Sequence, residues 1–277
     1  MHPTRYPDFR TVTSVLTELV LSAPRVDQGR WQGVDVSRDP AARCYELRDA
    51  CFTVDLGGVE DIGHWRADVR PNLPWADDHF AERVGGEPLN PGVQWRNWPW
   101  GRSADRFRGN DERFNHTYSE RLWPRWARRT PGGRFTEDHP APEDEGMRGI
   151  GWRYGDLDDL VRLLVRDPWT RQAWIPLFYP EDTGWGDGGR KPCSLGYQLT
   201  RRGDRLHLFY PLRSCDLVRH FSDDCYLAVR LLLWVLDQCH RLDPSWGSVA
   251  PGDYSMWMTS LHVFEVDRVR LLKERGS

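Results

Sequence analysis

Residues 205–236 read RLHLFYPLRSCDLVRHFSDDCYLAVRLLLWVL and contain a strand pattern, a polar turn and a long apolar segment in direct succession. The segment at residues 225–236 is almost wholly apolar and longer than most strands, so it predicts a buried central helix. Upstream, residues 196–200 and 205–211 flank Arg202-Gly203-Asp204, which predicts two short strands joined by a hairpin turn. The stretch therefore predicts strands followed by a core helix.

Similar patterns predict elements on both sides of this stretch. Apolar side chains at helical spacing predict a helix at residues 11–21, and alternation predicts a strand at residues 44–56. Asp156 is typical of a helix N-cap, and Asp167-Pro168 ends the helix that follows it. Further elements are expected at residues 173–178 (a buried strand), 262–265 (a strand) and 267–273 (a short terminal helix).

Residues 57–150 are rich in Gly, Pro, Trp and Arg and show little periodicity. Within them we expect a short helix at residues 79–83 and an exposed loop at residues 128–146. Aromatic-rich loops can form a stacking wall for flat ligands, although they more often serve core packing. The sequence thus predicts one α+β domain over residues 1–277, a large mixed sheet backed by helices, with residues 57–150 as a loop-rich, Trp-rich insertion region.

Composition limits the classes of function. The formal net charge of −3 does not favour binding to nucleic acid or to an anionic membrane. The N-terminus lacks a charged-then-apolar signal segment, and the longest apolar run, residues 231–236, is far shorter than the roughly 20 residues of a membrane span. We therefore expect a soluble, cytoplasmic protein. The six cysteines show no metal-binding spacing, so no metal site is expected.

Two short segments carry the clearest chemistry. Lys191-Pro192-Cys193-Ser194 offers one thiol, and Arg213-Ser214-Cys215-Asp216 follows it at a distance of twenty residues. A nearby guanidinium favours the thiolate, the nucleophilic form of cysteine, and also binds phosphate through two parallel hydrogen bonds. The segments predict thiolate chemistry on a phosphorylated substrate. For an isolated cysteine, a structural thiol is the commoner role.

The order of these motifs resembles the thymidylate synthase superfamily from about residue 150 to the end of the chain. Pro-Cys, a strand pair and Arg-Ser-x-Asp are similar to its signature. Ser260-Leu261-His262-Val263-Phe264 resembles its His-x-Tyr segment, and Asp167-Pro168-Trp169-Thr170-Arg171 resembles its Asp-Pro-x-Ser-Arg. The resemblance implies a thymidylate synthase-like fold and a one-carbon transferase with 5,10-methylenetetrahydrofolate as cofactor.

The resemblance also implies roles for single residues. Cys193 is then the thiolate that adds to C6 of a pyrimidine ring, after which C5 attacks the one-carbon unit. Arg213 and Ser214 resemble the family's phosphate ligands. Asp216 resembles the carboxylate that contacts the folate pterin, although it can instead pair with Arg213. His262 resembles the histidine that binds the sugar.

Asp224 decides which base the resemblance implies, because it falls where thymidylate synthases place an Asn that reads uracil. Cytosine donates from its N4 amino group and accepts at N3, and a carboxyl group can match both positions. Phage deoxycytidylate hydroxymethylases make the same Asn-to-Asp change in a similar segment. The neighbouring Asp223 is the alternative reader, and a solvated Asp pair at a helix N-terminus is the structural alternative.

The remaining candidate residues depend on looser matches. Glu82, with Glu87 as its rival, is the candidate general acid/base, since a buried Glu with a raised pKa suits that work. Tyr118 resembles the family's active-site tyrosine, although a packed core tyrosine is an equal interpretation.

Basic residues from two further regions are phosphate candidates. Arg171 resembles the arginine that the family lends to its neighbour's phosphate site, which implies a homodimer, and Gln172 replaces a frequent second arginine. Arg38 and Arg43 are candidates for a mobile N-terminal phosphate ligand.

The favoured function is a CMP or dCMP 5-hydroxymethyltransferase. Phe264 stands where the family has a tyrosine that contacts the sugar, which leaves room for a ribonucleotide. Only residues 265–277 follow that strand, and a short tail suits an enzyme that admits water. Such an enzyme would serve nucleoside antibiotic biosynthesis or base modification. The alternatives are a thymidylate synthase or another C5-methylating relative, a non-catalytic nucleotide- or RNA-binding protein on the same scaffold, and a Cys–His hydrolase.

Overall fold

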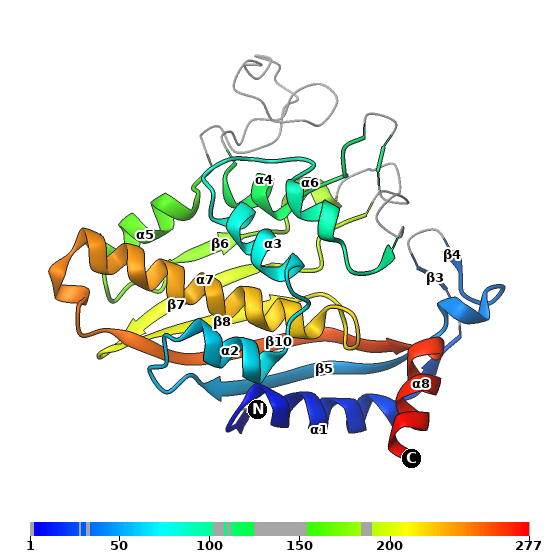
Figure 1. The fold of residues 1–277 in the computed structure, drawn as a ribbon. Helices are drawn as coiled ribbons and strands as arrows, with labels where there is room; N and C mark the ends of the chain where they lie inside the picture. Colours follow the sequence, from blue (N-terminus) through cyan, green and yellow to red (C-terminus); the bar gives the residue numbers. More distant parts are fainter. Residues whose placement is uncertain are drawn as a thin grey trace.

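A large mixed sheet with helices packed on one face forms the centre of the protein (Figure 1). The computed structural model describes residues 3–27, 29–31, 34–101, 108–109, 112–124, 154–183 and 190–276. The strands are β1 (Thr4–Tyr6), β2 (Arg25–Val26), β3 (Arg30–Trp31), β4 (Val34–Asp35), β5 (Cys44–Asp55), β6 (Trp174–Pro176), β7 (Gly196–Arg202), β8 (Arg205–Leu212), β9 (Cys215–Asp216) and β10 (Ala250–Phe264). The large sheet has the order β1-β5-β10-β8-β7-β6, with β2 beside β5 and β9 beside β10.

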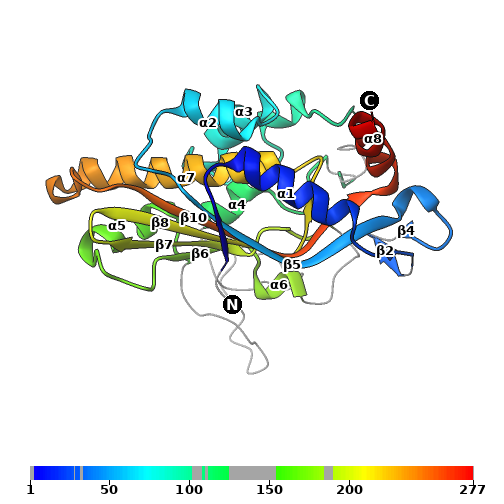
Figure 2. The same ribbon diagram turned by 90° about the horizontal axis from the view of Figure 1, so that it is seen from below.

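The helices are α1 (Phe9–Leu21), α2 (Ile62–Val69), α3 (Trp75–Arg83), α4 (Tyr118–Leu122), α5 (Leu157–Arg166), α6 (Pro180–Thr183), α7 (Phe221–Leu242) and α8 (Glu265–Gly276). Short 3₁₀ helices are η1 (Pro40–Ala42), η2 (Val93–Asn97) and η4 (Pro244–Trp246). Figure 2 shows α1 and α7 on one face of the sheet, with α2 and α3 beyond α7. None of the described helices combines the length and apolarity needed to cross a bilayer.

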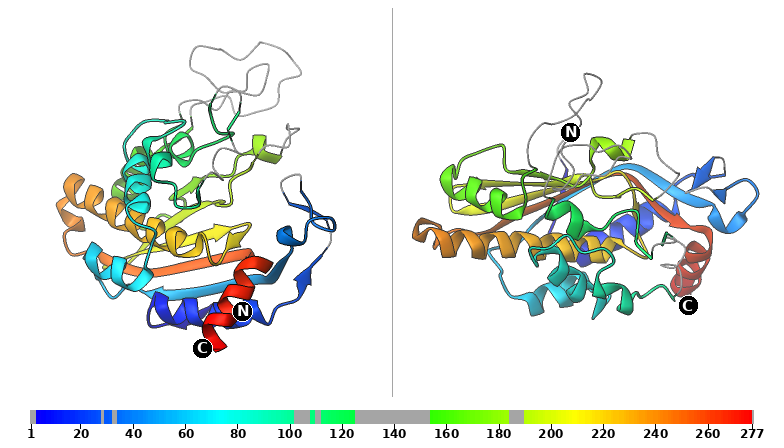
Figure 3. Two further views of the ribbon diagram at one scale, coloured as in Figure 1. Left: turned by 45° about the vertical axis from the view of Figure 1, so that its right-hand side comes forward. Right: turned by 90° about the horizontal axis from the view of Figure 1, so that it is seen from above.

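The central unit is a crossover from β8 through α7 to β10. β8 and β10 pair in parallel, so the chain must return to the same end of the sheet before β10 begins, and α7 makes that return. Figure 3 shows α7 extending along the sheet. The helix buries most of its length because apolar side chains occur nearly all round it. The crossover places the first turn of α7 near the carboxyl end of β8.

The hairpin, the core helix and the N-terminal helix that we expected from the sequence are confirmed as β7–β8, α7 and α1. The helix capped by Asp156 is confirmed as α5, with reciprocal bonds between Asp156 and Asp159. Residues 128–146, expected to form a loop, lie outside the described residues.

Two sequence-based expectations about element boundaries need correction. Residues 262–265 are not a separate short strand, since residues 262–264 end the 15-residue β10 and Glu265 begins α8. Pro251-Gly252, near the start of β10, is a sequence pattern typical of a turn, which hides the early part of this strand. The register of β10 with β8 shifts between Pro251 and Tyr254. The Trp-rich region contains α2, α3, η2 and α4 rather than one short helix, because its short helices lack a long apolar period.

Asp68 of α2 fixes the start of α1 from outside that helix. Its buried carboxylate accepts from the backbone N–H of Phe9 at 3.0 Å and, more weakly, from that of Arg10 at 3.4 Å. The Arg10 side chain adds an ion pair at 3.2 Å. The first N–H groups of a helix have no partner within it, so this carboxylate satisfies them and joins α1 to α2.

We expect Asp68→Ala to lower the free energy of unfolding by about 1–3 kcal/mol, because it leaves buried N–H groups without acceptors. Urea denaturation followed by circular dichroism measures the change. Asp158→Ala, at an exposed position in the first turn of α5, is the matched control. Equal effects of the two substitutions would contradict the capping role of Asp68.

Candidate active site

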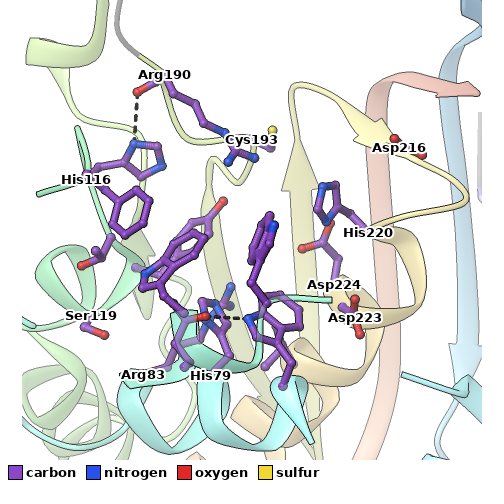
Figure 4. Close-up of a pocket in the computed structure, with 18 of the residues that line it drawn as sticks. His79, Arg83, His116, Ser119, Arg190, Cys193, Asp216, His220, Asp223 and Asp224 are labelled. Atoms are coloured by element: carbon purple, nitrogen blue, oxygen red, sulfur yellow. Dashed lines mark hydrogen bonds between the residues drawn. The ribbon is translucent and has the colours of Figure 1, made fainter. Parts of the chain in front are cut away.

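One open cavity collects most of the chemically active side chains (Figure 4). Its empty space, counted together with open solvent at the mouth, is about 920 Å³. Its walls come from α3, η2, residues 114–119, residues 190–193, β9 and the first turn of α7. In Figure 4, Cys193 lies at one end, Asp224 and His220 lie on one wall, and His79 and Arg83 rise from α3.

Cys193 lies on the cavity wall next to the second motif, Arg213-Ser214-Cys215-Asp216. Ser214 donates from its Oγ to the Sγ of Cys193 at 3.6 Å, and the backbone N–H of Arg213 donates to the Cys193 carbonyl at 2.9 Å. A hydroxyl donor at the sulfur stabilises the thiolate form. The second motif therefore fixes the cysteine both through its backbone and at its reactive atom.

The Arg213 guanidinium points to backbone rather than into the cavity. Nε donates to the Pro192 carbonyl at 2.7 Å, and a terminal nitrogen donates to the Lys191 carbonyl at 2.9 Å. Another terminal nitrogen reaches Ser214 Oγ at 3.3 Å. Arg213 thus holds the loop that carries Cys193, and it contacts the thiol only through Ser214.

Asp224 projects from the first turn of α7 and lines the cavity. Burial raises the pKa of its carboxyl from 3.8 to about 7, although the Arg83 cation opposes the shift; the neighbouring Asp223 adds to it. Its contacts are long, with Tyr210 donating at 3.4 Å and the Cys215 thiol donating at 3.7 Å. The carboxyl therefore exists in both protonation states near neutral pH and can bind a ligand.

Asp223 lines the same cavity but its carboxylate is committed elsewhere. It accepts from the backbone N–H and from the side-chain amide of Asn72, both at 2.7 Å. Burial raises the pKa of Asp223 to about 6, while these bonds oppose the shift. The two adjacent acids thus differ, since Asp223 ties α7 to the segment before α3 and Asp224 faces the cavity.

Tyr118 lies at the start of α4 and also lines the cavity. Burial, reinforced by Cys193, raises the pKa of its phenol to about 12, so the phenol stays protonated. Its hydroxyl accepts from the Oγ of Ser194 at 3.2 Å.

Arg83 is the principal residue that sequence analysis missed. It is buried, lines the cavity and donates to the Tyr197 hydroxyl at 2.9 Å. Its guanidinium carbon lies 4.3 Å from the centre of the Tyr118 ring. Within the described residues it forms no ion pair, so its charge acts on Asp224 and the surrounding tyrosines at longer range. The only sequence signal was its place on the short helix expected at residues 79–83.

The histidines on the wall, also missed from sequence, are neutral at neutral pH. Burial lowers the pKa of His79 well below its usual range, and burial lowers those of His116 and His220 to about 3. A neutral imidazole accepts or donates hydrogen bonds without adding charge. A group of aromatic rings completes this side: Trp75 stacks on His79 with ring centres 4.9 Å apart, and Trp95 stacks on Phe114 at 4.0 Å.

Several predicted site residues lie behind the wall. Glu82 is buried but does not line the cavity, because its carboxylate accepts from the backbone N–H of Gln94 at 2.7 Å at the start of η2. Burial raises the pKa of Glu82. His262 is buried on β10 outside the lining, and burial lowers its pKa to about 4. Asp216 does line the cavity, and it also accepts from the N–H groups of Val218 and Arg219 at 3.0 and 3.1 Å.

The other predicted phosphate ligands lie apart from this cavity. Arg171 is exposed between α5 and β6, and Arg38 is exposed and pairs with Asp35 at 3.3 Å. Arg43 is partly buried beside η1 and does not line the cavity, and Glu87 is exposed. Within the described chain, no group of three or more His, Cys, Asp or Glu side chains is placed to hold a metal ion.

The raised pKa of Asp224 predicts a pH-dependent cost to stability. Between its unfolded value of 3.8 and about 7, the folded state holds a proton that the unfolded state has lost, so stability falls as pH rises through that window. We expect Asp224→Asn to remove this dependence and to stabilise the protein relative to wild type at pH 8. The difference in free energy of unfolding between Asp224→Asn and wild type grows by at most about 1.4 kcal/mol per pH unit between roughly pH 4 and 7. Urea denaturation of both proteins at pH 5, 6, 7 and 8 tests it, and a constant difference would contradict it.

Comparison with known proteins bears on the fold. No family model and no curated protein matches the sequence. Among solved structures, the chain is similar to the thermostable thymidylate synthase A from Bacillus subtilis. The two have 16% identical residues and a TM-score of 0.58, over 95% of this chain and 82% of that one. The expected α+β architecture, a large mixed sheet backed by helices in a thymidylate synthase-like fold, is therefore confirmed.

Proposed function

We propose that this protein is a pyrimidine nucleotide C5-hydroxymethyltransferase that acts on CMP or dCMP with 5,10-methylenetetrahydrofolate and water. The observation that carries the proposal is the pairing, in one cavity, of a thiol at Cys193 with a carboxyl at Asp224 whose pKa is about 7. The thiol suits nucleophilic attack on a pyrimidine ring, and the carboxyl suits hydrogen bonding to the edge of a cytosine base.

The protonated form of Asp224 matches the edge of cytosine. Its carbonyl oxygen accepts from the N4 amino group while its O–H donates to N3. Uracil presents the opposite edge, an acceptor at O4 and a donor at N3. An ordinary surface aspartate would be ionised at neutral pH and could only accept, so the burial of Asp224 supplies the donor that N3 of cytosine needs.

In the proposed reaction, the Cys193 thiolate adds to C6 of the ring and makes C5 electron-rich. Ser214 holds the sulfur in place by its hydrogen bond at 3.6 Å. When bound, 5,10-methylenetetrahydrofolate supplies the one-carbon unit at the oxidation level of formaldehyde. Loss of the C5 proton and release of tetrahydrofolate leave a methylene group on C5. Water adds to that methylene to form the hydroxymethyl group, and expulsion of the thiolate from C6 restores the ring and the enzyme.

The cavity wall fits a flat folate ring system. The indoles of Trp75, Trp95 and Trp98 line the cavity on the side formed by α3 and η2, and the Trp75 N–H donates to Gln94 at 2.6 Å. Flat rings stack favourably on such side chains. Asp216 lines the same space, and burial raises its pKa to about 6, so its carboxyl can exchange hydrogen bonds with pterin nitrogens.

Positive side chains at the cavity suit a nucleotide phosphate. Arg190, Lys191 and Ser214 all line it. Arg213 supports this group through its backbone contacts, and His262 stays our candidate for the sugar. The ring of Phe264 packs edge-on to His262 with centres 5.3 Å apart, where a tyrosine hydroxyl would otherwise reach the sugar, so both CMP and dCMP remain substrates of the proposal.

We propose further that the protein is a homodimer in which Arg171 serves the neighbour's phosphate site. Trp174 of β6 and Trp257 of β10 are 40% and 44% exposed, which is high for residues of this size in a sheet. A second copy of the chain packed against the sheet at Trp174 and Trp257 would bury these two side chains. Glu82 is retained as the acid/base candidate only if nucleotide binding moves η2 and frees its carboxylate, and Arg38 and Arg43 require a similar movement.

The direct test is to incubate the purified protein with 5,10-methylenetetrahydrofolate and CMP, dCMP, UMP or dUMP and to measure product masses. We expect a gain of CH2O on a cytosine nucleotide only. Cys193→Ser should abolish turnover while nucleotide still binds, and Cys51→Ser, on the far face of the sheet, should not change it. A gain of CH2 on dUMP would indicate a methylating synthase, and binding without any product would favour a non-catalytic nucleotide-binding protein.

Asp224→Asn tests the base reader. An amide keeps a donor for O4 of uracil at every pH, whereas an ionised carboxylate repels O4, so we expect the ratio of kcat/KM for cytosine over uracil nucleotides to fall at least roughly tenfold. Asp223→Asn is the matched control, since that side chain is bound to Asn72. An unchanged ratio in Asp224→Asn would move the reading role to another residue.

A further inference from the structure

A continuous row of hydrogen bonds connects the two ends of the cavity through its back wall. The Tyr210 hydroxyl of β8 lies 3.4 Å from a carboxyl oxygen of Asp224 and 2.5 Å from the Oγ of Ser194. The same Oγ lies 3.2 Å from the Tyr118 hydroxyl. Asp224 and Tyr118 line the cavity, whereas Tyr210 and Ser194 are fully buried behind it and do not.

The number of protons in this row permits two directions of donation. Each hydroxyl carries one proton. When Asp224 is ionised, it must accept, so Tyr210 donates to it, Ser194 donates to Tyr210, and Tyr118 donates to Ser194. When Asp224 is protonated, it can donate to Tyr210, and every bond in the row then reverses. Reversal requires only rotation of the hydroxyl groups, with no net transfer of a proton between residues.

The two directions leave Tyr118 in different states. In the ionised state, its proton is used within the row. In the protonated state, Tyr118 accepts from Ser194, and its own O–H is available to the cavity, where Cys193 lies. The Tyr118 phenol and the Cys193 thiol interact electrostatically. After burial, Cys193 is the second cause of the raised pKa of Tyr118.

We propose that Tyr210 and Ser194 are positioning residues that couple the protonation of Asp224 to the donor at Tyr118, so that the base-reading carboxyl controls the reactivity of the Cys193 thiol. The roles of Asp224 and Cys193 rest on the proposed function. Under that function, cytosine binding favours protonated Asp224, which frees Tyr118 to stabilise the thiolate at the moment that it is needed.

Other charged and titratable groups face the two ends of the row. Asp224 is faced by Arg83 from α3, Asp223 from α7 and Cys215 from β9, and Tyr118 is faced by Arg83, His79, His116 and Cys193. The three buried imidazoles, His79, His116 and His220, remain neutral above pH 6.5, because burial lowers each pKa below that value. Arg83 influences both ends electrostatically, so the test must break the row while Arg83 stays in place.

The experiment measures Cys193 alkylation by iodoacetamide from pH 5.5 to 9.5 without nucleotide, with mass spectrometry of the Cys193 peptide. In wild type, we expect a second inflection near pH 7 beside the thiol titration, because Asp224 ionises there. In Tyr210→Phe the row is broken and Tyr118 is free to donate at every pH. We expect that inflection to vanish and alkylation at pH 8 to be roughly threefold faster.

Tyr254→Phe is the matched control, since Tyr254 is also fully buried on the sheet but packs against Phe9 and Phe52 outside the cavity. It should keep the wild-type profile. Ser194→Ala should reproduce Tyr210→Phe, and it serves as the test if Tyr210→Phe fails to fold.

Profiles of Tyr210→Phe and Ser194→Ala that coincide with wild type would overturn the proposal, as would an equal change in Tyr254→Phe. The measurement needs no substrate. A protein that shows the shift but forms no hydroxymethyl product would therefore contradict the proposed function and leave the coupling supported.

Discussion

The parallel pairing of β8 with β10 is the constraint on which the rest of the structure depends. Parallel neighbours require a long crossover, and here the crossover is α7. The helix must start near the carboxyl end of β8, so its first turn meets the loop that carries Cys193. Ser194 bridges to Leu212 at the end of β8, and Arg213 anchors the same loop through its guanidinium. Topology alone thus brings a thiol and an acidic helix start together, at the position where open α/β sheets commonly bind ligands.

The acidic first turn of α7 shows how burial divides the work between identical side chains. A helix N-terminus favours negative charge, which would lower both pKa values, yet burial outweighs it at both positions. Asp223 recovers its lost hydration from two strong bonds to Asn72. Among the described residues, Asp224 has two long contacts and a more distant cation, so less of its desolvation cost is compensated. That uncompensated cost makes it a chemically useful group.

The sequence predicted the parts of the fold that local pattern determines. The hairpin at Arg202-Gly203-Asp204, the cap at Asp156 and the apolar run of α7 each contain their own signal. The motif order also led to the cavity residues Cys193, Ser214 and Asp224. Long-range contacts were not predictable in this way. Nothing local indicates that Arg83 would be buried beneath Tyr118, or that Arg213 would turn onto backbone carbonyls. Glu82 was a candidate because a buried Glu suits acid/base work, but its hydrogen bond to η2 was not predictable, since η2 has no periodic sequence pattern.

The bond from Glu82 to the backbone of Gln94 has a consequence for how this cavity can diversify. Together with the indole bond from Trp75 to Gln94, it joins η2 to α3. Gly92 belongs to the same joint, since a Cβ there would meet a Glu82 oxygen at 1.9 Å. The aromatic wall is therefore attached to α3, which is itself bound to α7 through bonds from Tyr226 and Arg230 to Asp77, and Asp224 lies in the first turn of α7. Substitutions on the outer faces of η2 can reshape the aromatic side of the cavity without changing the contacts of Asp224. Under the proposed function, the scaffold can in this way acquire new one-carbon donors and new bases as independent traits.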